Sequence, residues 1–582
     1  MKSLLTLKKY FLRYKTKLLL GVLFIFISNL GAVYIPLFMK DSINALQKHV
    51  EYSVLAHYAL LIVGASIISG VFRFLIRQTI IVVSREIEYD IRQDFWSHIQ
   101  NLSLRYFQNT STGNIMAHAT NDLNAVRTFI GPAVMYSIDT FVRLVMVIVI
   151  MLSLSLSLTL YSLLPLPVLS YLVYRLGKKI HIKYTFIQEK FSELTTKAQE
   201  SFSGIRVIKS YVREDNEIQE YQNLSQDYLN KNMDMVKIES LFQPILSFVT
   251  GISIIFVIWL GGVQVIEGKL NLGQISAFVI YLSLLIWPMI AIGWVVNLVQ
   301  QGAASMKRLN KMFNEKYEIQ DSSSTDYSIK NIQGNIEFRN VSFRYAENLP
   351  YVFQNISFEI PAGCTAAIVG HTGSGKTSLV NLIPRLYDIT GGEVLIDGKD
   401  IRQIPIATLR RNIGIVPQET FLFSDTLANN IAYGAESTDM AVVESVAEIA
   451  QLKKDVESFP HKYETVLGER GITLSGGQKQ RTCLARALAT DPSILILDDS
   501  FSAVDTNTEE EILKKLRTFM KDRTSIIISH RISTVKDADK IFVIDKGRIA
   551  EQGNHEELVR KQGIYAGLHY KQLLEKELEE LS

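Results

Sequence analysis

The sequence predicts an all-α membrane domain of six helices followed by a soluble α/β domain. Six apolar runs of about 20 residues, the length that crosses a bilayer as a helix, lie before residue 300. After about residue 336, short apolar runs alternate with Gly, Asp and Lys, as they do in soluble α/β proteins. A glycine-rich stretch follows one β-branched run and precedes a helical pattern, which is the arrangement of a phosphate-binding loop.

The first span is preceded by lysines and arginines between residues 2 and 17. The positive-inside rule therefore places the N-terminus in the cytoplasm. This span lacks a small-residue cleavage site and is longer than a signal-peptide core, so we expect it to be retained. Six crossings predict a multi-pass protein of the cell inner (cytoplasmic) membrane with N- and C-termini in the cytoplasm. The expected spans are 18–39, 55–80, 134–157, 159–178, 243–266 and 274–298.

Two long segments separate the second span from the third and the fourth span from the fifth. Residues 83–133 and 179–242 show helical periodicity with charged faces and few turn signals. We expect helices that continue past the membrane into the cytoplasm, where they are able to touch a cytoplasmic domain.

Polar residues inside spans are candidates for function. Asp139 and Arg143 lie four residues apart, on one helical face, and are expected to pair. A structural ion pair is the favoured interpretation, with contact to substrate or ion as the alternative. Arg73 and Arg77 fit either a central cavity or the lipid headgroups.

Composition excludes some classes of partner and chemistry. The net charge of +3 is too small to indicate nucleic acid binding. The two cysteines, Cys364 and Cys483, stand in no metal-ligand or redox spacing, and we expect structural thiols in a reducing compartment. The small, polar stretch DSSSTDYS (321–328) reads as a linker. The expected domains are a membrane domain (1–310), a linker (311–335) and a nucleotide-binding domain (336–582).

The phosphate-binding loop is GHTGSGKTS (370–378), which fits the pattern G-x-x-x-x-G-K-[ST]. Glycines let the backbone amides curl around phosphate, Lys376 neutralises the β and γ phosphates, and the Thr377 hydroxyl can ligate Mg²⁺. Alone, this motif indicates nucleotide binding and no particular machine. The predicted nucleotide-binding residues here are Gly370, Thr372, Gly373, Ser374, Gly375, Lys376, Thr377 and Ser378.

Two further motifs follow the loop in the chain. LSGGQ (474–478) leads into a basic helix, so Ser475, Gly476, Gly477 and Gln478 are expected at a helix N-terminus that can bind an anion. SILILDD (493–499) is an apolar strand that ends in acid. Such a strand holds Mg²⁺ beside a phosphate loop, and this places Asp498 at the metal.

In this order and spacing, the motifs resemble those of the ATP-binding cassette (ABC) transporters, specifically exporters with six spans fused ahead of one cassette. The resemblance covers nearly the whole chain. It implies an ABC exporter transmembrane domain followed by an α/β P-loop NTPase cassette that hydrolyses ATP with Mg²⁺ to drive transport. It further implies that Tyr345 stacks on adenine, that Gln418 senses Mg²⁺, and that His530 is the switch histidine at the γ-phosphate.

The resemblance also assigns loops. GERG (468–471) is similar to the exporter loop that touches the cytoplasmic helices, and SAVD (502–505) to the loop that crosses the dimer interface. The segments 106–123 and 203–215 resemble the first and second cytoplasmic loops of the membrane domain. Short coupling helices are therefore expected near 109–117 and 210–222.

Asp499 departs from the family pattern, because the residue after the metal aspartate is usually glutamate. Aspartate is one methylene shorter, and a displacement of about 1 Å can cost on the order of a hundredfold in rate. Heterodimeric exporters of the family combine one weakened site with one competent site, and the weakened site typically has Asp here on a chain whose own LSGGQ is intact. This favours a heterodimer, most like the bacterial multidrug half-transporters, with a homodimer of slow sites as the alternative.

The resulting expectation is ATP-driven export of an amphipathic drug or lipid by one half of a dimeric exporter in the lipid bilayer. Asp499, His530 and Gln418 are the expected catalytic residues, and Thr377, Gln418 and Asp498 the expected metal ligands. An ATP-gated channel or sensor built on the same cassette is the other class considered. Apolar spans do not identify the substrate, because the bilayer requires them in any case.

Overall fold

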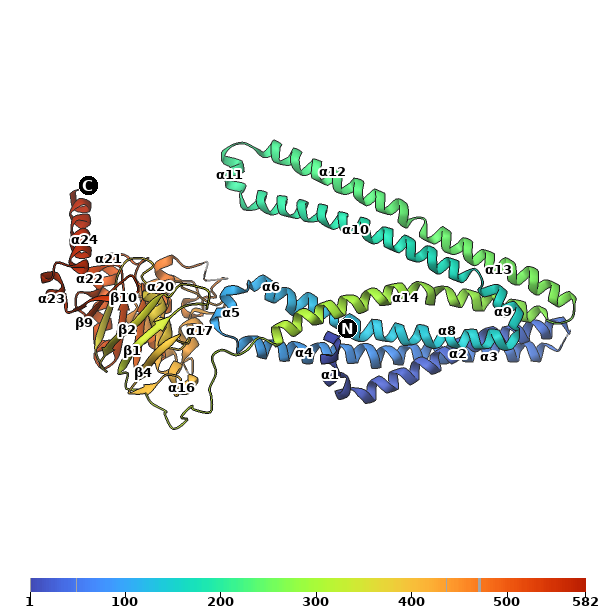
Figure 1. Ribbon diagram of the computed structural model, residues 1–582, viewed down its shortest axis with the longest axis horizontal. Coiled ribbons are helices and arrows are strands. Elements are labelled where there is room, and N and C mark those ends of the chain that lie inside the picture. The colour runs from blue at the N-terminus through green and yellow to red at the C-terminus, as the bar shows by residue number, and fades with distance from the viewer. Residues whose placement is uncertain (1, 49, 436, 469–470, 472, 582) are drawn as a thin grey trace. The chain divides into compact units, whose positions relative to one another are not determined.

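The computed structural model describes residues 2–48, 50–435, 437–468, 471 and 473–581 (Figure 1). The chain forms two compact units. One comprises Met1–Gln100 and Thr112–Glu315, and the other comprises Asn101–Ser111 and Lys316–Ser582. The short segment 101–111 therefore packs with the C-terminal unit, although its neighbours in the sequence belong to the helical one. The domain boundaries expected from the sequence stay predictions.

The first unit is entirely helical. Among the described residues, six helical segments are long and apolar enough to cross a membrane. Five of them contain one expected span each, while the expected span 134–157 runs past Leu154, where its segment ends because Ser155 is extended. They are Lys15–Gln47, Tyr52–Gln100, Thr112–Leu154, Leu156–Ser203, Glu214–Ile266 and Leu272–Phe313. Their components are α2 (Lys15–Gln47), α3 (Tyr52–Ile76), α4 (Val82–Gln100), α6 (Thr112–Ala117), α7 (Leu123–Thr128), α8 (Val134–Leu154), α9 (Leu156–Leu163), α10 (Leu166–Ser203), α12 (Glu214–Glu239), α13 (Phe242–Ile266) and α14 (Leu272–Phe313).

Two of these segments contain π-helical turns, in which each turn has about one extra residue. η2 (Arg77–Ile81) joins α3 to α4, while η3 (His118–Asp122) and η4 (Phe129–Ala133) flank α7. Such turns shift the side chains that follow them around the helix axis, and they are frequent at functional sites.

A ladder of charges fastens the N-terminal residues to α4. The N-terminus forms η1 (Lys2–Leu7) and α1 (Lys8–Arg13) before α2 begins. Three basic side chains, spaced four residues apart, form ion pairs with three acidic side chains of α4 that have the same spacing. The two segments run in opposite directions, so the first basic residue pairs with the last acidic one. The pairs are Lys9–Asp94 at 2.8 Å, Arg13–Asp90 at 2.9 Å and Lys17–Glu86 at 2.6 Å.

The sequence predicts short helices near 109–117 and 210–222, and α6 (Thr112–Ala117) lies within the first of these ranges. Two other short helices of the loop sequences lie mostly before the ranges. They are α5 (Leu104–Asn109) and α11 (Ile205–Ser210). The backbone sets these limits, because Ser103 and Thr110 are extended on either side of α5. In the second unit, the Ser103 hydroxyl and the Arg105 guanidinium both donate to the Glu318 carboxylate, at 2.9 and 3.3 Å.

The second unit contains two sheets. The larger has the order β10-β9-β3-β8-β7-β6, and the smaller has the order β2-β1-β4-β5. β3, β6, β7, β8 and β9 run parallel, so their carboxyl ends meet at one edge. The strands are β1 (Ile336–Phe343), β2 (Phe353–Ile360), β3 (Thr365–Val369), β4 (Gly391–Ile396), β5 (Lys399–Asp400), β6 (Ile413–Val416), β7 (Ile494–Asp498), β8 (Thr524–Ile528), β9 (Lys540–Asp545) and β10 (Arg548–Gly553).

Helices cover the larger sheet and complete two apolar cores. Residues of β7 alternate between these cores, which explains why ILIL is apolar on both faces. The helices are α15 (Lys376–Leu382), α16 (Ile406–Arg411), α17 (Leu427–Ile431), α18 (Met440–Ile449), α19 (Lys453–Ser458), α20 (Gly476–Ala489), α21 (Thr506–Met520), α22 (Ile532–Val535), α23 (His555–Arg560) and α24 (Ile564–Leu581).

Candidate nucleotide-binding site

A cavity of about 300 Å³ opens at the edge where the parallel strands end. Its wall is formed in part by the loop between β3 and α15, by the end of β7 and by the residues that follow β8. Most of the residues that the motifs single out line it, although they are far apart in the sequence. They are Tyr345, Thr372, Gly373, Gly375, Lys376, Thr377, Ser378, Gln418, Asp498, Asp499 and His530.

Glycines give the loop between β3 and α15 its path. Gly370, Gly373 and Gly375 have φ values of 155°, 82° and 96°, which side chains rarely tolerate. A Cβ on Gly370 would also lie 2.2 Å from the carbonyl oxygen of Ile544, and a Cβ on Gly375 would lie 2.7 Å from Val352. Any larger residue would therefore displace the loop.

The Lys376 side chain is buried inside this loop. Its Nζ atom donates to the carbonyl oxygens of Gly370 and His371, each at 2.9 Å. These bonds hold the ammonium group under the curled backbone, where it can reach a phosphate. Burial lowers the pKa of Lys376, while the carboxylates of Asp498 and Asp499 oppose that shift.

The residues present fit a nucleotide phosphate and Mg²⁺. The Ser374 hydroxyl is buried in the phosphate loop and has no hydrogen-bond partner among the described residues, so it is able to donate to a ligand. No group of three His, Cys, Asp or Glu side chains in the described part of the chain could hold a metal. Mg²⁺ bound with substrate phosphates needs only one or two protein carboxylates, so Asp498 beside Thr377 is sufficient.

Asp498 ends β7 and is only 3% exposed. Burial raises the pKa of its carboxyl group, and the neighbouring Asp499 adds to the increase. A hydrogen bond from Thr377 acts in the opposite direction. The arrangement keeps a desolvated carboxyl and a hydroxyl together, which is the donor set that a divalent cation completes.

Asp499 has its backbone fixed on both sides. Its φ value is 46°, its amide donates to the carbonyl oxygen of Ile528 at 2.9 Å, and its own carbonyl accepts from the Ser502 hydroxyl at 3.2 Å. Because the backbone is anchored, one more methylene in the side chain would allow the carboxylate to reach further into the cavity.

His530 follows β8 and is held through its backbone. Gln572 of α24 donates a hydrogen bond to the carbonyl oxygen of His530, and its Oε1 atom accepts from the amide of Ile532 at 2.8 Å. One side chain therefore fixes the chain on both sides of Arg531. Sequence reasoning missed Gln572, because a glutamine on an amphipathic C-terminal helix carries no motif.

Tyr345 lies after β1 at the rim of the cavity. Its hydroxyl forms a hydrogen bond of 2.7 Å with the Ser378 hydroxyl. Its ring makes edge contacts with Phe343 and Tyr387, at centroid distances of 4.9 and 5.3 Å. These contacts hold an aromatic face beside the phosphate loop.

Comparison with known proteins identifies the architecture. The family model described as "ABC transporter transmembrane region" matches residues 18–289, and that described as "ABC transporter" matches residues 353–502. The chain belongs to the ABC transporter family. Membership confirms the predicted fold class, an exporter-type transmembrane domain fused to an ABC cassette, and implies ATP hydrolysis coupled to transport.

Relatives of this ABC transporter span nearly its whole length. The uncharacterized ABC transporter ATP-binding protein YknU of Bacillus subtilis (strain 168) is 35% identical over 98% of this chain and 97% of its own. The probable multidrug resistance protein YheI of the same organism is 38% identical over 83% of each chain. The ATP-dependent lipid A-core flippase of Syntrophus aciditrophicus (strain SB) is 36% identical over 85% of this chain and 82% of its own.

A solved structure supports the same assignment. A bacterial Atm1-family ABC exporter with ATP bound shares 28% identity, with a TM-score of 0.79, over 96% of this chain and 98% of that one. The name of YheI refers to multidrug resistance, that of the Syntrophus protein to a lipid flippase, and that of the solved structure to an exporter. The chain is therefore similar, over most of its length, to ABC transporters that include an exporter of known structure.

The LSGGQ segment of this ABC transporter lies outside its own nucleotide cavity. Ser475 caps α20, with its hydroxyl accepting from the Gln478 amide at 3.2 Å while the Gln478 side chain accepts from the Ser475 amide at 2.9 Å. Gly477 allows the close approach of the next loop, since a Cβ there would meet the carbonyl oxygen of Ala503 at 2.9 Å. Ser475 and Gly476 are exposed, and none of residues 474–478 lines the cavity.

The two loops assigned by resemblance have different outcomes. In SAVD, the Asp505 carboxylate caps α21 by accepting from the Thr508 amide at 2.9 Å. Gln480 holds the rest of that loop through Ser502 and Ala503, with both bonds at 2.9 Å. In GERG (468–471), residues 469 and 470 lie outside the described residues.

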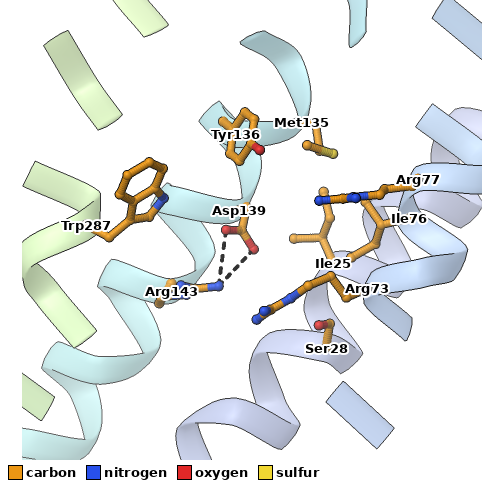
Figure 2. A pocket seen from close by; sticks show the side chains of 10 residues that line it. All are labelled: Ile25, Ser28, Arg73, Ile76, Arg77, Met135, Tyr136, Asp139, Arg143 and Trp287. Atoms are coloured by element: carbon orange, nitrogen blue, oxygen red, sulfur yellow. Dashed lines mark hydrogen bonds and ion pairs between the residues drawn. The ribbon is translucent and has the colours of Figure 1, made fainter. Parts of the chain in front are cut away.

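The predicted pair inside the spans is present. The Arg143 guanidinium lies 3.2 Å from the Asp139 carboxylate, in a cavity that Arg73 and Arg77 also line (Figure 2). Asn29 of α2 joins the two, because its amide donates to Asp139 at 2.7 Å and its oxygen accepts from Arg143 at 2.9 Å. Sequence reasoning missed Asn29, which stands in a different span.

Proposed function

We propose that this chain exports an amphipathic substrate of the drug or lipid class across the cytoplasmic membrane as one half of a dimeric exporter. We further propose that its own ATPase site is weakened. The observation that carries the second statement is the anchored backbone of Asp499 beside the proposed metal ligand Asp498.

Each cavity residue has a proposed role toward MgATP. Tyr345 stacks on adenine, the phosphate loop with Lys376 binds the phosphates, and Thr377, Gln418 and Asp498 hold Mg²⁺. The remaining loop contacts come from Gly370, Thr372, Gly373, Ser374, Gly375 and Ser378. When bound, Mg²⁺ neutralises charge that develops on the transferred phosphoryl group. The unpartnered Ser374 hydroxyl supports this assignment.

Asp499, His530 and Gln418 are the proposed catalytic residues. Orientation of the attacking water by a carboxylate requires hydrogen-bond distance. The Asp499 amide donates to Ile528 and its carbonyl oxygen accepts from Ser502, and these two bonds keep the backbone from moving forward to replace the missing methylene. A shortfall of about 1 Å costs on the order of a hundredfold in rate.

Two features support a dimer. Ser475 and Gly476 of LSGGQ are exposed, Gly477 and Gln478 are half-buried, and none of the four lines the cavity of its own chain, so they are available to a nucleotide held by a partner cassette. At the turn between α10 and α12, large apolar side chains are exposed, which is costly unless a partner covers them. They are Phe202, Ile205, Val207, Tyr211 and Val212.

A heterodimer is the favoured assembly. This chain combines a shortened carboxylate with an unmodified LSGGQ, so it can complete a faster site on a partner that carries glutamate. A homodimer in which Asp499 serves twice would be slow at both sites. No nucleic acid partner is expected, because the net charge is only +3.

Vectorial transport tests the proposal. The full-length chain, alone and with a co-expressed half-transporter that carries glutamate after its metal aspartate, is placed in inside-out vesicles with a fluorescent amphipathic dye. Accumulation that requires ATP and Mg²⁺ is expected for the exporter. An ATP-dependent ion current without dye accumulation would contradict export and indicate a channel. Lys376→Ala, combined with alanine at the phosphate-loop lysine of the co-expressed partner, is the matched control for nucleotide dependence.

A further inference from the structure

The LSGGQ end of α20 is held by a carboxylate that belongs to none of the motifs. Asp455 lies in α19, and its Oδ1 atom accepts from the Nε2 atom of Gln478 at 2.8 Å. Its Oδ2 atom accepts from the Arg481 guanidinium, also at 2.8 Å. Gln478 and Arg481 are three residues apart on one face of α20. One side chain of a separate helix therefore contacts two successive turns of α20.

The Asp455 carboxylate determines which way the Gln478 amide faces. An ionised carboxylate only accepts hydrogen bonds, whereas a glutamine amide has one end that donates and one end that accepts. With Nε2 directed to Asp455, Oε1 is left to accept from the Ser475 amide at 2.9 Å. A reversed Gln478 amide would place two acceptors together at Asp455 and two donors together at Ser475. Asp455 thus selects the orientation that closes the reciprocal capping box of α20.

The capping box shapes the outward-facing part of LSGGQ. The Ser475 hydroxyl accepts from the Gln478 amide at 3.2 Å, and a hydroxyl that accepts in this way keeps its hydrogen for donation to another group. The first amides of a helix have no acceptor inside the helix and carry its positive dipole end. The orientation of the Gln478 side chain therefore affects the donors that LSGGQ presents to an anion.

Asp455 is itself fixed in position. The adjacent Val456 is 1% exposed and belongs to the apolar core that also contains Cys483 of α20. The ion pair between Asp455 and Arg481 is partly shielded, because their side chains are only 24% and 14% exposed. Arg481 also donates to the carbonyl oxygen of Gln451, which lies between α18 and α19. These contacts hold α19 against the first turns of α20.

We propose that Asp455 is a positioning residue for ATP hydrolysis at the partner's site. It orients the Gln478 amide, and through the capping box it holds Ser475 and the two glycines in the geometry that meets the nucleotide of the partner cassette. Asp455 itself touches neither nucleotide nor Mg²⁺. This role rests on the proposed dimer, in which LSGGQ of one chain completes the site of the other.

The two sites of the dimer are measured separately. The full-length chain carries Asp499→Asn and is co-expressed with a half-transporter that has glutamate after its metal aspartate, so that ATP turnover comes from the partner's site. Asp455→Ala should lower kcat of that site about tenfold with a smaller change in KM, because a small misplacement of LSGGQ weakens the transition state most. Asp455→Asn keeps one acceptor for Gln478 and should give an intermediate kcat. Glu457→Ala, exposed on the same helix, is the matched control.

The reverse arrangement distinguishes positioning from a general loss of structure. Here this chain carries Asp499→Glu, and glutamine replaces the catalytic glutamate of the partner. Turnover then comes from the cavity of this chain, which the partner's LSGGQ completes, and Asp455→Ala should change it less than twofold. A similar loss of turnover in both arrangements would mean that Asp455 only supports folding or dimerisation, and would overturn the positioning role.

Hydrogen exchange tests the capping box in the full-length chain without a partner. The amides of Ser475 and Gln478 are both bonded in this box, so they should exchange severalfold faster in Asp455→Ala than in Glu457→Ala. The amides of α15, beside the phosphate loop, should exchange at the same rate in both variants. Mass spectrometry of the corresponding peptides measures these rates. Equal exchange at Ser475 and Gln478 would overturn the role of Asp455.

Ser475→Ala separates the fate of this role from that of the dimer. Loss of partner-site turnover in Ser475→Ala but not in Asp455→Ala would leave the dimer standing and overturn the positioning role. Unchanged partner-site turnover in both variants would mean that LSGGQ of this chain completes no partner site. That result would overturn the proposed dimer, and the role of Asp455 with it.

Discussion

Gln572 brackets His530: its amide donates to the carbonyl oxygen of His530, and its oxygen accepts from the amide of Ile532 at 2.8 Å. We expect Gln572→Ala to lower kcat for ATP about tenfold with little change in KM, because the histidine loses its backbone support while the phosphate loop is untouched. The measurement is ATPase turnover in the Asp499→Glu background, where this chain's site is expected to be active.

Gln572→Glu separates the two bonds, because glutamate keeps the acceptor toward Ile532 and loses the donor toward His530. An intermediate kcat is expected. Tyr570→Ala, at an exposed neighbour, is the control. Unchanged turnover in Gln572→Ala would contradict the positioning role.

Glu318 connects the linker to α5. Its carboxylate accepts from the Ser103 hydroxyl and the Arg105 guanidinium. Removal of these bonds by Glu318→Ala should reduce the stimulation of ATPase by transported amphiphile severalfold, while basal turnover stays close to wild type. The measurement is turnover with and without amphiphile, and Glu315→Ala is the matched control. Equal stimulation in both variants would remove Glu318 from the coupling pathway.

The ion pair between Arg13 and Asp90 predicts that exchanging the two charges restores the stability that a single charge reversal removes. Arg13→Asp places a second carboxylate beside Asp90, and should lower the midpoint of thermal unfolding by about 2 °C, as expected for about 1 kcal/mol. Arg13→Asp with Asp90→Arg restores the opposite charges and should recover most of the loss. High salt should reduce both effects, since the Arg13 side chain is 66% exposed. Absence of rescue would mean that Arg13 acts through packing alone.

Cys364 should be a poor nucleophile. Burial raises the pKa of its thiol to about 11, and the adjacent Asp539 adds to the increase. The thiolate fraction at pH 8 is then about 0.1%, and alkylation should accelerate about tenfold per pH unit until pH 11. Mass spectrometry of iodoacetamide-treated protein measures the rate. Fast labelling of Cys364 at pH 8 would contradict a structural thiol.

Sequence reasoning succeeded where function depends on local patterns. The Asp139–Arg143 pair followed from helical spacing, and the phosphate loop from glycines that the backbone requires. It failed where partners come from remote segments: Asn29 reaches Asp139 from another span, and Gln572 reaches His530 from the C-terminal helix. The short helix α5 begins at Leu104, before the expected range 109–117. The extended backbone at Ser103 sets this start, and the sequence motif does not reveal it.

The central claim is that Asp499 weakens the ATPase site of this chain because its side chain is one methylene shorter than glutamate. ATPase turnover of the purified full-length chain, measured for wild type, Asp499→Glu and Asp499→Asn, tests it most directly. The account predicts slow turnover in the wild type, an increase of about tenfold or more in Asp499→Glu, and none in Asp499→Asn. Substantial turnover of the wild-type chain alone that Asp499→Glu does not raise and that Asp499→Asn abolishes would contradict it, because aspartate would then already reach the water.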